Sequence, residues 1–220
     1  MKQTEKIRIL NLYACLGGNR YKWDEVANIE VTAIELDPEL ARMYKERFPN
    51  DKVIVADAHQ YLLDHYKEFD FIWTSPPCPT HSKSRFWAYG KTMPVYPDMK
   101  LYEEIIFLDN FFDGKYVVEN VTPYYEPLIP AQKRGRHLYW TNFILPNNLN
   151  ERKLNGSLCL MENEINVLSE FHDYDFRKYK GKQRLDKMAR NLVDYEAGLT
   201  IFNIARGIFE KPKTSQLELL

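Results

Sequence analysis

The sequence predicts an α/β fold with a mainly parallel central sheet and helices on both of its faces. Short apolar strands alternate with helices through the first half of the 220-residue chain, and strands linked in this way lie parallel. Glycines, carboxylates or prolines follow several of the strands. Open sheets of this class bind their ligands at the carboxyl ends of the strands, so the fold class also predicts where a functional site lies.

The individual elements follow from local patterns of residues. Asp37 is expected to cap a helix that has Pro38 at its first position, and Asp113-Gly114 ends another. Apolar stretches predict strands at residues 7–13, 31–35, 53–56, 69–73, 115–121 and 137–143, and helices at residues 38–48, 60–67, 102–112 and 195–209.

Composition limits the classes of function. The chain is 45% hydrophobic, enough for one full core, and no apolar run reaches membrane-spanning length. Its 30 Lys and Arg residues balance 31 Asp and Glu residues, so a nucleic-acid partner would need a local basic surface. Three cysteines and a start without a signal sequence predict a reducing, cytoplasmic setting.

The fourth strand leads into Ser75-Pro76-Pro77-Cys78. The prolines end the strand and stiffen the turn, so Cys78 is expected at its tip. A free cysteine is usually a packed core residue. A metal ligand is disfavoured because Cys15 and Cys159 are distant and no CxxC pair exists. The position at the end of a strand favours the third interpretation, a nucleophile.

A cofactor site is indicated at the ends of the first three strands. A turn of small residues that includes Gly17 and Gly18 follows the first strand, and Glu35 and Asp57 end the next two. Glu35 lies about 20 residues after that turn, which is the spacing at which a carboxylate binds ribose hydroxyls in nucleotide-binding sheets. The turn might equally be a tight connection, and Asp57 a helix cap. Together they suit a nucleoside, with Asp57 at an adenine amino group.

Further motifs resemble the (cytosine-5) DNA methyltransferase family. They occur in family order over nearly the whole chain. The matching stretches are Asn11–Gly18, Pro76-Pro77-Cys78, Glu119-Asn120-Val121, Gln132 with Arg134 and Arg136, and Asn191-Leu192-Val193. The resemblance implies a Rossmann-like S-adenosylmethionine-dependent methyltransferase fold, S-adenosylmethionine as cofactor and double-stranded DNA as substrate.

The resemblance also implies residue roles. Cys78 would attack carbon 6 of a flipped-out cytosine, and Glu119 would hydrogen-bond ring nitrogen 3 and the exocyclic amine. Gln132, Arg134 and Arg136 would steady the base, Glu119 or the target phosphate, unless they form a solvated basic turn. Cofactor contacts are expected from Tyr13, Ala14, Leu16, Gly17, Gly18, Glu35, Leu36, Asp57, Ala58, Pro76, Asn191 and Val193.

DNA contacts are expected from two segments. Ser82, Lys83, Arg85 and Trp87 belong to a loop that is either a lid or a surface connection. Lys178, Lys180 and Arg184 lie in a basic run that would bind phosphates unless it is an exposed flexible linker.

Some positions depart from the family pattern. Asn11 replaces an acid, and Cys15 stands at the first glycine, where a positive backbone angle would strain it. Pro79 and His81 stand where the family more often has Gln and Phe, which changes the wall of the base pocket.

The expected organisation is a catalytic and cofactor-binding domain at residues 1–146 and 186–210, a target-recognition insertion at 147–185 and a flexible tail at 211–220. So short an insertion predicts a short or relaxed target sequence, or recognition by a partner protein or a homodimer. A compact enzyme of a phage or mobile element, acting in the cytoplasm of a bacterial cell or an infected host, fits this size. The alternatives are an RNA or exocyclic-amino acceptor, and a non-catalytic cofactor- or DNA-binding regulator.

Overall fold

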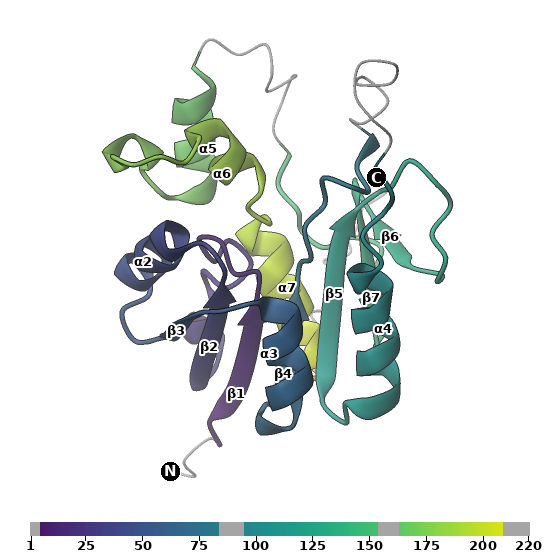
Figure 1. Cartoon of the computed structure of the whole chain (residues 1–220). Coiled ribbons are helices and arrows are strands. Elements are labelled where there is room, and N and C mark those ends of the chain that lie inside the picture. The colour runs from purple at the N-terminus through teal and green to yellow at the C-terminus, as the bar shows by residue number, and fades with distance from the viewer. Residues whose placement is uncertain (1–4, 84–94, 154–162, 209–220) are drawn as a thin grey trace, which may run out of the picture.

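The computed structural model describes residues 5–83, 95–153 and 163–208. Within them, one sheet of seven strands runs in the order β3-β2-β1-β4-β5-β7-β6 (Figure 1). β1 to β5 pair in parallel, whereas β7 and β6 are antiparallel, so the predicted fold class is confirmed. The strands are β1 (Ile7–Leu12), β2 (Ile29–Glu35), β3 (Lys52–Val55), β4 (Phe71–Thr74), β5 (Lys115–Val121), β6 (Gln132–Arg134) and β7 (His137–Thr141).

The predicted helices are present, with shifts of a few residues at their ends. Asp37 caps α2 as expected, because its side chain accepts hydrogen bonds from the backbone N–H groups of Glu39 at 2.8 Å and Leu40 at 3.2 Å. α1, α5, α6 and strand β6 were not predicted. The helices are α1 (Trp23–Val26), α2 (Pro38–Arg47), α3 (Ala58–His65), η1 (Tyr66–Glu68), α4 (Lys100–Phe111), α5 (Glu164–His172), η4 (Phe176–Lys178), α6 (Leu185–Arg190) and α7 (Tyr195–Ala205).

Alternating side chains on the strands build a core on each face of the sheet. In β1, Leu10 and Leu12 pack on the face covered by α3 and α4, and Ile9 packs on the face covered by α1 and α7. On the second face the rings of Trp23 and Phe202 lie 5.0 Å apart. Each such buried side chain stabilises the fold by about 1.5–3 kcal/mol, so the sheet is a rigid base for its carboxyl-end loops.

A smaller helical layer lies beside α2, at the carboxyl end of the sheet (Figure 1). Leu168 of α5, Phe176 of η4 and Met188 of α6 form a core of their own. This core includes Leu16 from the loop after β1 and Met43 from α2. The layer is therefore packed onto the part of the chain in which the sequence predicts the cofactor site.

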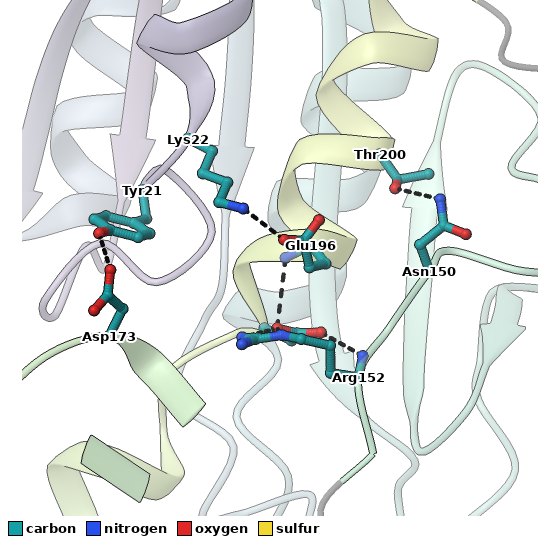
Figure 2. A network of polar contacts seen from close by, with 8 residues as sticks. Tyr21, Lys22, Asn150, Arg152, Asp173, Glu196 and Thr200 are labelled. Atoms are coloured by element: carbon teal, nitrogen blue, oxygen red, sulfur yellow. Dashed lines mark hydrogen bonds and ion pairs between the residues drawn. The ribbon is translucent and has the colours of Figure 1, made fainter. Parts of the chain in front are cut away.

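Polar contacts hold the start of α7 to its surroundings (Figure 2). The backbone N–H of Arg152 donates to Asp194 at 2.7 Å and its Nε donates to the same carboxylate at 2.9 Å. Lys22 bonds Glu196 at 2.7 Å, and Tyr21 donates to Asp173. Asp194 is 5% exposed, so its ion pair is the least screened of these contacts. They join the loop after β1 and the segment after β7 to the C-terminal helices.

In the part of the chain that the structure describes, no helix has both the length and the apolar character needed to cross a bilayer.

Candidate active site

The turn after β4 is held on both sides of Cys78. The side chain of Asn120, buried on β5, donates to the carbonyl of Pro76 at 3.0 Å. On the other side, the backbone N–H groups of His81 and Ser82 donate to the carbonyl of Cys78 at 2.9 and 3.0 Å. The prolines and these bonds together fix the turn, as the sequence predicts for its tip.

Cys78 is half-buried. Two charged groups affect the pKa of its thiol. Burial raises the pKa of Cys78, the carboxylate of Glu119 raises it further, and Lys187 on α6 acts in the opposite direction. Glu119 is 6% exposed on β5, the strand next to β4. The structure therefore brings the predicted nucleophile and the predicted base-binding carboxylate together, with the thiol protonated at neutral pH.

The sequence analysis missed His137, which lies beside Glu119, and Glu151, which lies beside His137. The Nε2 atom of His137, at the start of β7, is 3.9 Å from Oε1 of Glu119, and its Nδ1 atom is 3.9 Å from Oε1 of Glu151. His137 is buried. A histidine directly after the arginine motif was the available sequence signal, but only the pairing of β5 with β7 shows that it faces Glu119.

The wall residue His81 is also buried, and burial lowers its pKa. Its Nδ1 atom lies 2.5 Å from the hydroxyl of Tyr125. Pro79, in contrast, is exposed. The departures at these two positions therefore differ in kind, since only His81 is part of the packed wall.

The side chains of Gln132 and Arg134 form hydrogen bonds within and next to the β6–β7 hairpin rather than with Cys78. The Gln132 amide donates to Thr141 at 2.7 Å and to the carbonyl of Phe143 at 2.9 Å. The guanidinium of Arg134 donates to the backbone carbonyls of Lys133, Leu145 and Pro146. The two side chains fasten the hairpin of β6 and β7 to the segment that follows it.

Arg136 lies exposed in the two-residue turn of that hairpin, after Gly135 with φ +54°. A positive φ at the first turn position is what glycine provides. Arg136 is therefore the arginine of the motif whose side chain is open to solvent.

The predicted cofactor residues converge at the ends of β1, β2 and β3. Glu35 accepts hydrogen bonds from the backbone N–H groups of Cys15 at 2.8 Å and Asp37 at 3.0 Å. A carboxylate has about four acceptor positions, so Glu35 keeps acceptors for two ribose hydroxyls. Leu36 is 67% exposed and Val55 is 52% exposed. Two apolar side chains are thus exposed at the ends of β2 and β3.

Asp57 does cap α3, because it accepts from the backbone N–H of Gln60 at 3.0 Å, and Lys100 lies 3.7 Å away. This does not use all of its acceptor positions, so a contact with adenine stays a proposal. Ala58, next in sequence, is buried at the start of α3, and Pro76 contributes the carbonyl held by Asn120.

The glycines of the first loop are needed for packing. A Cβ on Gly17, which has φ +64°, would come within 2.5 Å of the Phe48 ring, and one on Gly18 would lie 2.5 Å from the carbonyl of Val193. Leu16 is fully buried and Ala14 is buried. The Asn-Leu-Val segment thus lies against the first loop, with Val193 buried and Asn191 exposed at the end of α6.

A second buried carboxylate lies below this site and was also missed. Glu104 on α4 is fully buried and accepts from the hydroxyls of Tyr13 at 2.6 Å and Thr74 at 2.7 Å. Nδ1 of His59 is 3.1 Å away. The sequence signal was an acid within the apolar stripe of the helix, between Leu101 and Ile105.

The structure describes some of the residues that are predicted to contact DNA. Lys83 is exposed beside the cysteine turn, and Ser82 pairs with Pro123. Arg85 and Trp87 lie outside the described residues. Lys178 and Lys180 are exposed on the helical layer, and Arg184 forms an ion pair with Asp186 at 2.7 Å.

The basic run is docked rather than a free linker. The side chain of Gln183 donates to Asp37 at 2.6 Å, and the backbone N–H of Lys182 lies 3.3 Å from Glu39. Both acids belong to the start of α2, next to Glu35. The run therefore lies on the cofactor side of the site.

The chain is similar to known proteins in sequence and in structure. The sequence model of C-5 cytosine-specific DNA methylases matches residues 7–121. Among solved structures, a mutant DNMT2 of Spodoptera frugiperda is 25% identical with a TM-score of 0.38, over 52% of this chain and 35% of that chain. A SAM-dependent methyltransferase of Agrobacterium tumefaciens is 14% identical with a TM-score of 0.40, over 55% of this chain and 40% of that chain. No curated protein matches significantly.

The chain thus spans two fifths or less of the length of these two proteins. Its fold is the Rossmann-like fold of S-adenosylmethionine-dependent methyltransferases, and S-adenosylmethionine is the cofactor. Since the matched region covers more than half of its 220 residues, the chain belongs to the C-5 cytosine-specific DNA methylase family.

Proposed function

We propose that this chain transfers a methyl group to carbon 5 of cytosine in double-stranded DNA, through a covalent adduct of Cys78 with a flipped-out base. The observation that carries the proposal is that Cys78, after β4, lies close enough to buried Glu119 of the neighbouring strand β5 for the carboxylate to raise its pKa. When bound, S-adenosylmethionine supplies an electrophilic methyl group. Glu35, Leu36 and Asp57 would hold its adenosine part.

The chain's own residues prepare the acceptor carbon. Carbon 5 of cytosine is a poor nucleophile until Cys78 Sγ bonds to carbon 6. Glu119 hydrogen-bonds nitrogen 3 and the exocyclic amine, and this contact strengthens as charge develops on the ring. Because burial and Glu119 raise the pKa of Cys78, the thiol must give its proton to water as Sγ bonds to carbon 6. After methyl transfer, a water-borne base takes the carbon 5 proton, the C–H pair restores the carbon 5–carbon 6 double bond, and Sγ leaves.

Few of the described residues are candidates for contacts with DNA. Flipping the base costs a few kcal/mol, and we assign phosphate contacts to Lys83, Lys178 and Lys180, which are exposed. Arg85 and Trp87 remain candidates from sequence alone. Residues 147–185 form the proposed target-recognition insertion. With about 1–3 kcal/mol of discrimination per base-edge pair, so short a segment favours a short or relaxed target, or a homodimer or partner protein that adds recognition.

The setting we propose is the cytoplasm of a bacterial cell or an infected host, since Cys15 and Cys78 are free thiols. Protection of DNA against a restriction enzyme is one use of this chemistry, and gene regulation is another.

The test is transfer of labelled methyl from S-adenosylmethionine to duplex DNA, with wild type, Cys78→Ala and the control Cys159→Ala. We expect transfer by wild type and the control, and none by Cys78→Ala. A 5-fluorocytosine duplex should form a covalent adduct with wild type, since the fluorine cannot leave as a proton. Transfer that survives in Cys78→Ala would refute the mechanism and indicate an amino acceptor. Transfer to RNA alone would refute the DNA substrate, and cofactor binding without transfer would indicate a non-catalytic regulator.

A further inference from the structure

His137 is a buried titratable residue that the proposed function does not yet use. It begins β7, directly after the hairpin turn, and is 8% exposed. Its two ring nitrogens face two different carboxylates, Glu119 and Glu151, each at 3.9 Å. One imidazole therefore stands between the base-binding carboxylate and a second acid that has no assigned role.

This arrangement restricts the proton on His137. A neutral imidazole has one N–H donor, so it can donate to only one of two flanking carboxylates, whereas an imidazolium donates to both. At 3.9 Å neither contact is a direct hydrogen bond, but a small movement or one bridging water closes such a gap.

In the described part of the chain, the charged and titratable groups around His137 come from β5, β7, the β6–β7 hairpin and the segment that follows it. The guanidinium of Arg134, its neighbour across the β6–β7 ladder, is taken up by backbone carbonyls. The ring of Tyr139 lies edge-on at 6.3 Å. These groups are Glu119 of β5, Tyr139 of β7, Glu151 of the following segment, and Arg134 and the exposed Arg136 of the hairpin; Arg152 and Asp194, which pair with each other, act on Tyr139.

We propose that His137 is a positioning residue that keeps a proton available to Glu119, and so determines when Glu119 can protonate nitrogen 3 of cytosine. This inference rests on the proposed function and deepens it. As the Sγ–carbon 6 bond forms, the carbon 5–carbon 6 π pair moves to carbon 5–carbon 4, and the carbon 4–nitrogen 3 π pair moves to nitrogen 3. The carboxylate of Glu119 takes the Nε2 proton of protonated His137 and passes it to nitrogen 3, which leaves His137 neutral and Glu119 again a carboxylate. When Sγ leaves, the proton returns by the same path.

The test uses release of tritium from [5-³H]cytosine in duplex DNA, followed with pH. The variants are His137→Gln, which keeps an N–H donor but cannot titrate, and Glu151→Gln. The matched control is His65→Gln, because His65 also pairs with a glutamate, at 2.7 Å, but at the exposed end of α3. Circular dichroism checks that each variant is folded.

We expect a bell-shaped profile for wild type and the control, with the rate falling about tenfold per pH unit on its alkaline side. His137→Gln should lose this alkaline limb, keep the acidic limb set by Cys78, and leave KM for DNA unchanged within about twofold. Glu151→Gln should move the alkaline limb to lower pH.

An alkaline limb that persists in His137→Gln would overturn the inference, as would a change confined to KM, which a structural role alone would give. Absence of both tritium release and methyl transfer in wild type would instead overturn the proposed function. The two failures are thus distinguishable.

Discussion

Replacement of Glu104 should be the most destabilising single change near the proposed cofactor site. Its carboxylate is fully buried and accepts hydrogen bonds from Tyr13 and Thr74, with His59 at 3.1 Å. These partners come from the ends of β1 and β4 and from the start of α3. The loss of one side chain would therefore loosen three elements that position the site.

The magnitude follows from the donors that Glu104→Ala leaves behind. Thr74 is 0% exposed and cannot recover its bond from water, at a cost of about 1–3 kcal/mol. Tyr13 and His59 are partly exposed, so each adds less, and the lost packing adds further. We expect about 3–5 kcal/mol for Glu104→Ala and about 1–2 kcal/mol for Glu104→Gln, which keeps one acceptor.

The matched control is Glu103→Ala, one position earlier on α4. Glu103 is 62% exposed and lies 3.4 Å from His59, so its loss should cost less than about 1 kcal/mol. The assay is urea unfolding followed by the fluorescence of buried Trp23 and Trp73. If Glu104→Ala and Glu103→Ala differ by less than about 1 kcal/mol, the buried carboxylate does not join these elements and the reasoning fails.

Two further predictions concern titrating groups. The hydrogen bond to Glu104 raises the pKa of His59, so its stabilising contribution is complete below the unfolded value of about 6.5 and is lost as pH rises through the folded pKa. The difference in unfolding free energy between wild type and His59→Gln should therefore shrink with rising pH, and a difference that grows would contradict the assignment. Burial raises the pKa of Cys15 to about 12 and also raises that of Cys78, so iodoacetamide should alkylate Cys78 slowly at neutral pH, faster as pH rises, and Cys15 hardly at all. Peptide mass spectrometry measures both, and rapid alkylation of Cys78 at neutral pH would show that its thiol is not held protonated.

The fold could be predicted from the sequence because its signals are local. The predicted range of residues 115–121 is the range of β5, and Asp37 caps α2 as its spacing with Pro38 indicates. Parallel strands then bring residues such as Glu35 and Asp57 to one edge of the sheet without further information. This is why the expected location of the site follows from the sequence alone.

The neighbours of these residues could not be predicted, because they come from distant parts of the chain. Glu119 meets His137 only through the pairing of β5 with β7, and Glu151 joins them from a segment without regular structure. Arg134 was expected at the substrate but donates to backbone carbonyls. A motif gives the type of side chain, whereas the hairpin decides which partner that side chain reaches.

The departures from the family pattern at Cys15, in the first loop, and at Asn11, in β1, have different structural consequences. Cys15 has φ +46°, which confirms the strain expected there and costs about 1–2 kcal/mol for a residue with a Cβ. Its backbone N–H nevertheless donates to Glu35 at 2.8 Å, so the loop still orients the proposed ribose ligand. Asn11 is 1% exposed and accepts from Asn19 at 2.9 Å, a bond that an aspartate would accept only by burying a charge. The strain at Cys15 and the bond from its backbone N–H to Glu35 thus occur at the same residue, so Cys15→Gly should relieve the strain and leave Glu35 oriented for the proposed ribose contact.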